Sequence, residues 1–230
     1  MNRIDLNNPP DIREIKKIIA SDLLSIEAVF LRPEDPFVWA SGIRSPIYCD
    51  NRLTLTSPEI RDDIEAALAI IIKEYYPSAE VLMGTATAGI AHAAITAHIM
   101  GKPMGYVRSS AKDHGRKNLI EGRLSKGARV VIIEDLISTA GSAIRAVDSV
   151  RAAGGTVLGI ASIFTYGMKE SADRLIKANV TNVSLTDFDT VVSVAETEGY
   201  VRADRVKQLF DFRSNPSDAS WMEQAEPGDL

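Results

Sequence analysis

The spacing of apolar residues predicts two helical regions in the first third of the chain. Between Asp11 and about Phe30, isoleucine and leucine recur at roughly helical intervals, which predicts one or two amphipathic helices. At Ser57 a capping residue precedes a proline at the first helical position, and apolar residues follow at helical spacing as far as Tyr75. This second stretch is the clearest helix signal in the sequence.

Beyond residue 79 the pattern alternates between short apolar runs and helical spacing. The expected strands cover 80–83, 103–108, 129–134 and 156–165, and the expected helices cover 88–100 and 141–153. The run at 156–165 is too continuously apolar for a strand with one face in water. The alternation predicts an α/β fold with a mainly parallel sheet covered by helices on both sides.

Two segments lack this pattern. Residues 109–127 hold six basic residues and three glycines with little periodicity, which predicts a long loop of the kind that is usually functional or disordered. Residues 214–230 hold two prolines, a glycine and several acids, so this tail is expected to be poorly ordered unless Trp221 docks. The chain therefore divides into an N-terminal region at 1–55, a core at 56–213 and a tail at 214–230.

Composition and charge exclude several classes of protein. With 230 residues, of which 45% are hydrophobic, the chain can form one large domain with small additions. A formal net charge of -5 leaves no broad cationic surface, so no nucleic-acid partner is expected. The single cysteine, Cys49, excludes an internal disulfide framework, and no Cys/His cluster has metal-ligand spacing. The polar N-terminus and the lack of a long apolar run predict a cytoplasmic protein that is neither exported nor membrane-embedded.

The segment Val130–Ser142 carries the strongest chemical signal. An apolar strand runs into two acids, Glu134 and Asp135, followed by a loop of small and hydroxyl-bearing residues and the start of a helix. The backbone N–H groups of such a loop and of a helix N-terminus form an anion site. Adjacent carboxylates would repel a phosphate unless they accept hydrogen bonds from sugar hydroxyls or help to hold a hydrated Mg²⁺. A ribose phosphate satisfies both requirements; the alternative is an ordinary strand–turn–helix junction.

The same segment resembles the signature with which type I phosphoribosyltransferases bind 5-phosphoribosyl-1-pyrophosphate (PRPP). It shares the four apolar residues, the two acids and the short turn of Ser, Thr, Gly and Ala. The resemblance covers roughly residues 20–212 and implies the type I fold, a mainly parallel twisted sheet flanked by helices, with a small N-terminal hood over the active site. It implies that Glu134 and Asp135 hold the ribose, that Asp135 contributes to catalysis, and that the turn binds the 5′-phosphate. The implied PRPP-binding stretch is Glu134, Asp135, Leu136, Ile137, Ser138, Thr139, Ala140, Gly141 and Ser142.

The loop Gly84–Gly89 is the second candidate for phosphate binding. It has the glycine spacing of a Walker A loop, but Ile90 and Ala91 stand where Lys and Ser or Thr are required, which argues against nucleotide hydrolysis. In type I phosphoribosyltransferases the loop at this place meets the pyrophosphate. The resemblance extends that role to Thr85, Ala86 and Thr87 and implies a non-proline cis peptide near Ala86-Thr87. The alternative is a plain turn between a strand and a helix.

The basic run Tyr106–Lys117 looks like the mobile catalytic loop of orotate phosphoribosyltransferases, in which Arg, Lys and a Lys-Asp-His-Gly run recur. The resemblance implies that Arg108, Lys112 and His114 contact PRPP and act in catalysis, with Lys112 nearest the departing pyrophosphate. Because the family's loop reaches the neighbouring subunit's site, the resemblance also implies a homodimer with shared active sites. The alternative is a solvated basic loop.

Residues 39–52 resemble the family's hood, in which Ser-Gly, Ser-Pro and an aromatic residue lie over the base. A flat anionic pyrimidine carboxylate requires a stacking face, a guanidinium and backbone donors, which Tyr48, Arg44 and Arg52 could supply. The resemblance adds Ser138 to these orotate-binding residues. The alternative is a structural β-hairpin with solvent-facing arginines.

Some residues depart from the family pattern or have no role in it. Many relatives have lysine at the positions of Ala40 and Ser109 and an arginine near Tyr166. His92 and His98 lie six residues apart in an apolar helix and cannot face one metal, so we expect packing or a local hydrogen bond for each.

Taken together, the resemblance implies an enzyme that transfers the 5-phosphoribosyl group from PRPP to orotate, giving orotidine 5′-monophosphate and pyrophosphate. It implies Mg²⁺ as the cofactor, held mainly by PRPP and water with no direct protein ligand. One alternative is a phosphoribosyltransferase for a purine or uracil. Another is a non-catalytic PRPP sensor that binds nucleic acid, against which stand the acidic charge balance and the retained Lys112-Asp113-His114 run.

Overall fold

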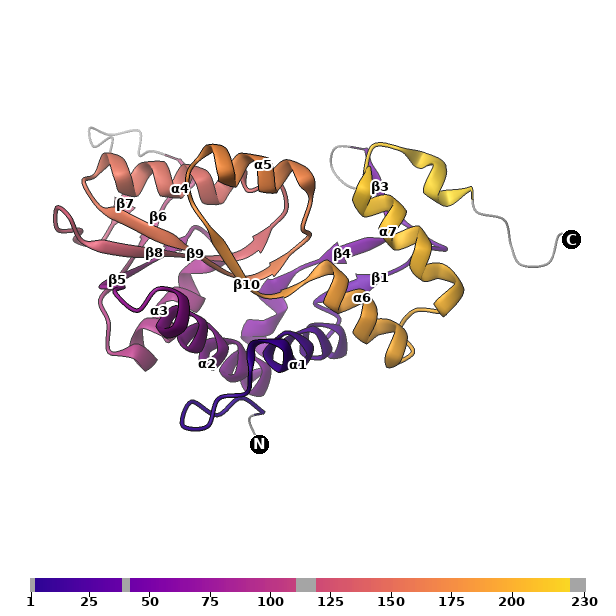
Figure 1. Ribbon diagram of the computed structural model, residues 1–230, viewed down its shortest axis with the longest axis horizontal. Coiled ribbons are helices and arrows are strands. Elements are labelled where there is room, and N and C mark those ends of the chain that lie inside the picture. The colour runs from indigo at the N-terminus through magenta and orange to yellow at the C-terminus, as the bar shows by residue number, and fades with distance from the viewer. Residues whose placement is uncertain (1–2, 39–41, 111–118, 224–230) are drawn as a thin grey trace, which may run out of the picture.

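The computed structural model describes residues 3–38, 42–110 and 119–223. Its centre is a six-stranded sheet in the order β10-β9-β8-β5-β6-β7 (Figure 1). Neighbouring strands run parallel except for β7, which is antiparallel to β6. The strands are β5 (Val81–Thr85), β6 (Met104–Val107), β7 (Ile120–Glu121), β8 (Arg129–Ile137), β9 (Thr156–Thr165) and β10 (Asn182–Asp187). The predicted α/β fold with a mainly parallel sheet is confirmed.

Helices cover both faces of this sheet (Figure 1). One face carries α1 (Ile12–Ser25), α2 (Pro58–Tyr75) and α3 (Gly89–Met100), and the other carries α4 (Gly141–Ala152) and α5 (Lys169–Lys177). The side chains of β8 alternate between the two layers, because successive residues of a strand point to opposite faces. Val131 and Ile133 join the apolar cluster of α1 to α3, and Val130 and Ile132 join the cluster of α4.

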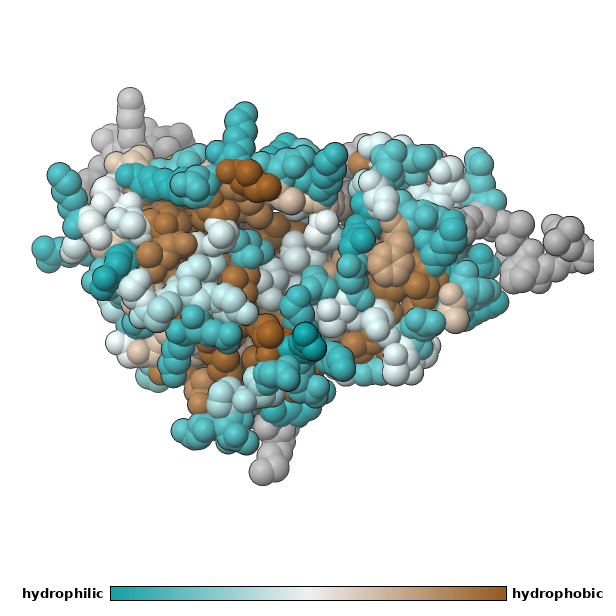
Figure 2. Space-filling model, in the orientation of Figure 1, coloured by the Kyte–Doolittle hydropathy of each residue, from teal (hydrophilic) through white to brown (hydrophobic). Residues whose placement is uncertain are grey.

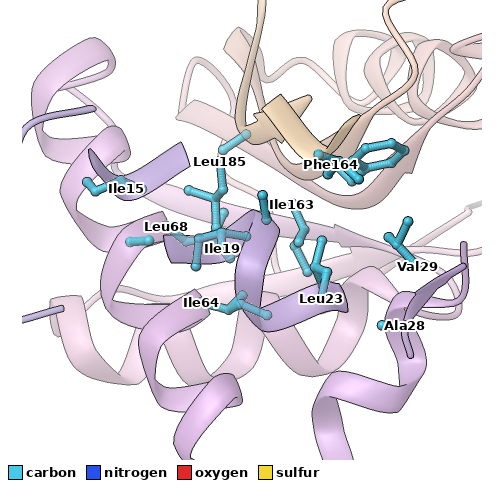
Figure 3. Packing of buried hydrophobic residues seen from close by; sticks show 14 of the residues in the cluster. Ile15, Ile19, Leu23, Ala28, Val29, Ile64, Leu68, Ile163, Phe164 and Leu185 are labelled. Carbon is cyan, nitrogen blue, oxygen red and sulfur yellow. The ribbon is translucent and has the colours of Figure 1, made fainter. Parts of the chain in front are cut away.

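The larger cluster fixes α1 and α2 against the sheet. In Figure 3, Ile19 and Leu23 of α1 lie beside Ile64 of α2 and close to Ile163 of β9. All four side chains are fully buried, and each such side chain contributes about 1.5–3 kcal/mol to stability through burial. This packing covers one face of β9, and Ile160 packs into the cluster of α4 on the other, so the apolar run has no face in water.

The N-terminal region contains strands that helical spacing alone did not predict. The helix α1 ends at Ser25, and Glu27 with φ of 57° turns the chain into β1 (Val29–Leu31), so Phe30 is a strand residue. Residues 42–56 form no single hairpin. Here β1 pairs with β4 (Ile47–Cys49), and β2 (Phe37–Val38) pairs with β3 (Arg44–Ser45); the 3-10 helix η1 (Asn51–Thr56) then leads into α2. We call residues 29–38 and 42–56 the hood.

The C-terminal region packs beside α1. It consists of α6 (Phe188–Thr197), η2 (Ala203–Arg205), α7 (Val206–Ser214) and η3 (Ala219–Met222). Trp221 is 2% exposed, and its ring lies edge-on to Phe212 with a centroid distance of 5.7 Å. Trp221 is therefore docked, as we expected for an ordered tail, and the structure describes this tail as far as Glu223.

Three local expectations are wrong. The strand expected at 129–134 is longer: β8 continues through Asp135 to Ile137, because Leu136 and Ile137 pair with Phe164 and Thr165 of β9. The long loop after β6 contains β7, whose Ile120 is buried against the sheet edge. The side chain of Ser57 makes no capping hydrogen bond to α2, which relies on its N-terminal proline instead.

Hydrophilic residues cover most of the face shown in Figure 2, and apolar residues show through only in separate patches. Across residues 3–38, 42–110 and 119–223, no helix combines the length and apolarity needed to cross a bilayer.

Candidate active site at the carboxyl ends of the central strands

The loop between β8 and α4 presents backbone N–H groups at a helix N-terminus. Ala140 occupies the left-handed region with φ of 62° and is followed by Gly141, the first residue of α4. No side chain of the described residues caps this end of α4. The first N–H groups of a helix have no partner within the helix, so they are available to an anion such as the predicted 5′-phosphate. Arg174 of α5 donates to the carbonyl of Thr139 at 3.4 Å and adds positive charge beside the loop.

The loop between β5 and α3 is shaped by two close backbone approaches. A Cβ at Gly84 would lie 2.5 Å from the carbonyl oxygen of Gly89, and a Cβ at Gly89 would lie 2.5 Å from that of Ile133. The glycines that resemble a Walker A loop therefore allow α3 to start directly against β5 and β8. The predicted cis peptide is confirmed, since the bond between Ala86 and Thr87 is cis.

The two adjacent acids have different surroundings. Glu134 is 4% exposed; its carboxyl accepts from Thr85 Oγ1 at 2.6 Å, from Ser142 Oγ at 3.1 Å and from the Asp135 N–H at 3.2 Å. Burial, followed by a hydrogen bond with the side-chain carboxyl of Asp135 and by the charge of that residue, raises the pKa of Glu134 to about 8. Asp135 is only half-buried, and its carbonyl accepts from Asn51 Nδ2 of the hood at 2.6 Å.

Arg108 lies at the end of β6, beside the loop between β5 and α3. Its backbone N–H donates to Leu119 at 2.9 Å, and its guanidinium lies 3.9 Å from Glu121 of β7. A cavity of about 60 Å³ is lined by Arg108, by Thr85 and Ala86, and by four residues of α4, namely Ser142, Arg145, Ala146 and Ser149. The structure therefore brings Arg108 and the predicted loop together. Lys112 and His114 lie outside the described residues, and their roles stay predictions.

The hood meets the core near Asp135 and the end of β9. Burial, then the charges of Asp135 and Asp50, raises the pKa of the Cys49 thiol. Burial, then Cys49 and Tyr48, raises the pKa of Tyr166, the residue after β9. Strands β4, β8 and β9 thus converge at the place where the resemblance puts the nitrogenous acceptor.

The three predicted orotate residues of the hood have unequal positions. Tyr48 is 41% exposed, and its ring lies 5.5 Å from that of Phe37. Arg52 donates to both oxygens of Asp50, at 2.6 and 2.7 Å, and this carboxylate raises the pKa of Arg52. Arg44 lines a hollow of about 430 Å³ with residues 216–219, Trp221 and Met222 of the C-terminal region, so it faces the tail and not Tyr48.

The histidines of α3 are explained by local structure. His92 is fully buried, and its Nδ1 lies 2.6 Å from Glu65 of α2, whose other oxygen accepts from Thr96 at 2.6 Å. His98 is exposed near the end of α3. The expectation of a local hydrogen bond is confirmed for His92.

Two residues of the site were missed from the sequence. Arg145 shares one face of α4 with Ser142 and Ser149, because the spacing of three and four residues repeats the helical turn, and this spacing could have identified it. Asn51 is 1% exposed and joins the hood to β8, but no local pattern marks a single asparagine as such a link. Among the described residues, no three His, Cys, Asp or Glu side chains gather into a group able to hold a metal.

Comparison with known proteins agrees with the geometry of both loops. The model of the phosphoribosyl transferase domain matches residues 54–206. The orotate phosphoribosyltransferase of Bacillus cytotoxicus is 54% identical over 208 residues, which make up 90% of this chain and 99% of the relative. The chain belongs to the orotate phosphoribosyltransferase family.

Membership in the orotate phosphoribosyltransferase family extends over the hood as well as the core. The Bacillus subtilis member is 50% identical over 210 residues, 91% of this chain and 97% of the relative. The crystal structure of the orotate phosphoribosyltransferase from Aeropyrum pernix is 30% identical and superposes with a TM-score of 0.69 over 80% of this chain and 99% of that one. The type I phosphoribosyltransferase fold is thus established for this chain.

Proposed function

We propose that the protein transfers the 5-phosphoribosyl group of PRPP to orotate, forming orotidine 5′-monophosphate and pyrophosphate for pyrimidine nucleotide synthesis. One observation carries this proposal: two loops suited to anions lie at the ends of adjacent strands β5 and β8, with the half-buried Asp135 between them and the hood. PRPP has the matching form, with a phosphate at one end, a pyrophosphate at the other and a diol between them. The names of the relatives supply orotate as the acceptor.

In this proposal each end of PRPP has its own loop. The N-terminus of α4, with Ser138 to Ser142, binds the 5′-phosphate through N–H and hydroxyl donors. Thr85, Ala86 and Thr87, with Arg108, face the pyrophosphate, and Lys112 and His114 complete that side. Asp135 accepts hydrogen bonds from the ribose hydroxyls.

The acceptor nitrogen displaces pyrophosphate at the anomeric carbon, so positive charge develops on the sugar and negative charge on the leaving group. Arg108 and Lys112 stabilise the leaving group where this charge accumulates, and such electrostatic stabilisation is commonly the largest catalytic contribution. Mg²⁺ fits this site as an ion that keeps its waters and binds phosphate oxygens, and when bound it neutralises part of the pyrophosphate charge.

On the acceptor side, Tyr48 offers an exposed ring to stack on orotate, and Arg52, Arg44 and Ser138 offer donors to its polar atoms. Arg52 would exchange Asp50 for the carboxylate of orotate. That exchange is inexpensive because the Arg52 side chain is 66% exposed, and exposed ion pairs contribute only about 0–1 kcal/mol.

A homodimer with shared active sites and a cytoplasmic location complete the proposal. The shared site follows from the resemblance of residues 106–117 to the family's catalytic loop. The location follows from the single half-buried Cys49, which suits a reducing compartment.

The deciding experiment measures pyrophosphate release from PRPP and Mg²⁺ with orotate, uracil, adenine or hypoxanthine as the acceptor. We expect orotate to be consumed, seen by its absorbance, and turned over at least about a hundred times faster than the other three. Pyrophosphate release with uracil or a purine, but not with orotate, would reassign the acceptor. PRPP binding without release would support a sensor.

Lys112→Ala tests the leaving-group role of the loop. We expect kcat to fall about a hundredfold, because one cation that stabilises the departing charge is lost, while the Kd of PRPP changes far less. Single-turnover kinetics and calorimetry separate the two quantities. Asp135→Asn is the comparison variant and should impair both; an unchanged rate in Lys112→Ala would refute the assignment.

A further inference from the structure

Two arginine side chains meet at the N-terminus of α4. A Cβ at Gly141, the first residue of this helix, would lie 3.5 Å from Nη1 of Arg145 and 3.6 Å from Nη1 of Arg174. Arg145 belongs to the next turn of the same helix, and its side chain points back toward the helix N-terminus, as helical side chains do. Arg174 belongs to α5. The two guanidinium groups therefore reach the same place from different elements of the fold.

The positive charge at this place is only partly balanced. Arg174 has one acid partner, since its Nη2 lies 2.5 Å from Glu170, and its Nη1 donates to the Thr139 carbonyl at 3.4 Å. Within the part of the chain that the structure describes, the guanidinium of Arg145 makes no ion pair and no hydrogen bond. The partial positive charge of the helix N-terminus adds to both arginines. Because like charges repel, this arrangement favours a bound anion.

Arg145 also lies on the side of α4 that faces the proposed PRPP site. It lines the cavity of about 60 Å³ together with Ser142 of α4, Thr85 and Ala86 of the loop between β5 and α3, and Arg108. The Arg145 side chain is exposed, so a ligand can reach it from solvent. Its neighbours are thus the elements proposed to hold the two ends of PRPP.

We propose that Arg145 and Arg174 bind the 5′-phosphate of PRPP, in addition to the N–H and hydroxyl donors of residues 138–142. The inference rests on the proposed function, which places this phosphate at the N-terminus of α4. Both Nη1 atoms lie beside Gly141 of that loop, which favours the 5′-phosphate over the pyrophosphate as their ligand. A guanidinium suits this role, because its planar set of N–H donors can bind two phosphate oxygens at once.

This role differs from that of the cations at the leaving group. The charge of the 5′-phosphate stays constant during the reaction, whereas negative charge builds up on the departing pyrophosphate. Loss of a donor to the 5′-phosphate should therefore weaken the ground state and the transition state alike, which raises KM and leaves kcat nearly unchanged. The 5′-phosphate also remains in the product, orotidine 5′-monophosphate, so the affinity for the product should fall as well.

Three variants test this role. Arg145→Gln and Arg174→Gln each replace one guanidinium by a neutral polar group. Lys177→Gln removes an exposed positive charge from the last turn of α5 and serves as the control. Pyrophosphate release with Mg²⁺ and saturating orotate gives kcat and the KM of PRPP. Calorimetry gives the Kd of orotidine 5′-monophosphate and, with Mg²⁺, the Kd of pyrophosphate.

We expect Arg145→Gln to raise the KM of PRPP and the Kd of orotidine 5′-monophosphate about tenfold. Its kcat should stay within about threefold of wild type, and its Kd of pyrophosphate should not change. Arg174→Gln should raise the same two constants by about threefold, because Glu170 already balances part of its charge. Lys177→Gln should match wild type. Since Arg145 has no partner among the described residues, its thermal unfolding should be unaltered, which separates lost binding from lost structure.

A Kd of orotidine 5′-monophosphate that rises no further in Arg145→Gln than in Lys177→Gln would overturn the proposal. So would a higher Kd of pyrophosphate, or a lower kcat at an unchanged KM, because Arg145 would then act on the leaving group. This comparison stands even if Arg174→Gln disturbs the loop through its contact with Thr139. A wild-type protein that neither releases pyrophosphate nor binds orotidine 5′-monophosphate would refute the proposed function itself, so the two failures are distinguishable.

Discussion

The phosphate end and the acceptor end of the candidate site are held by different kinds of contact. At the phosphate end, β5 and β8 lie side by side inside the sheet, and the main chain at Gly84 and Gly89 approaches so closely that no side chain fits. At the acceptor end, the hood is built from two short strand pairings and half-exposed side chains such as Tyr48. The groups proposed to bind the phosphates are thus backbone groups held by the sheet, and those proposed for the acceptor are side chains that can adjust.

The largest effect is expected where the phosphate end is most tightly packed. In Gly89→Ala the new methyl would lie 2.5 Å from the Ile133 carbonyl and 2.6 Å from Thr85 Oγ1, and neither strand can move away from it. We expect the free energy of unfolding to fall by about 3 kcal/mol in denaturant titrations. Gly101→Ala, at the other end of α3, has no atom within 4 Å of the new methyl and should cost only about 1 kcal/mol for its positive φ. Equal losses in the two variants would contradict the close approach.

The buried acid of the phosphate end should make stability depend on pH. Because the pKa of Glu134 rises to about 8 in the folded state, the folded protein retains a proton that the unfolded chain releases near pH 4.5. Stability should therefore fall as pH rises between these values, and Glu134→Gln should remove that fall. We expect the variant to gain roughly 1–3 kcal/mol over wild type at pH 8 and little at pH 5. Unfolding at several pH values checks this, with the exposed Glu74→Gln as control; a difference independent of pH would count against it.

Removal of the hydrogen bond that links the two ends should have an intermediate effect on stability. Asn51→Ala removes the hydrogen bond from Nδ2 to the Asp135 carbonyl and leaves that part-buried carbonyl without its hood partner. We expect a loss of about 1–2 kcal/mol in thermal unfolding and a severalfold rise in the KM of orotate. Thr56→Ala removes an exposed hydrogen bond at the end of the same 3-10 helix and serves as control. A KM of orotate that is identical in both variants would show that the hood is positioned by other contacts.

The smallest effect on stability is expected at the exposed surface of the hood. Tyr48→Ala should change the free energy of unfolding by less than about 0.5 kcal/mol, since the ring is 41% exposed. The KM of orotate should nevertheless rise severalfold, because the stacking face is lost, and Tyr48→Phe should retain it. If alanine and phenylalanine give the same KM, stacking on Tyr48 is not used.

The same contrast explains what the sequence could predict. The strands from β5 to β9, apart from the short β7, could be predicted because each is a continuous apolar run. The loop after β8 could be predicted because its residues follow one another directly in the sequence. The hood depends on pairings between β1 and β4 and between β2 and β3, in strands of only two or three residues that are too short to show a period. Local spacing carries no information about such pairings, so Asn51 and the orientation of Arg44 became visible only in three dimensions.

The acids of β8 show a second limit. Their identity and order indicated a ribose phosphate site, but their surroundings could not be read from the sequence. Glu134 is 4% exposed and bonded to Thr85 and Ser142, whereas Asp135 is half-buried. Because Thr85 belongs to another strand, this difference became visible only in three dimensions.

The docking of Trp221 also bears on how the chain can be shortened or extended. Its indole covers Phe212 of α7, and residues 216–219, Trp221 and Met222 form one wall of the hollow beside Arg44 of the hood. A protein cut after α7 would expose that aromatic ring and remove the wall. Affinity tags and fusion partners therefore belong after Glu223, where they leave the indole in place.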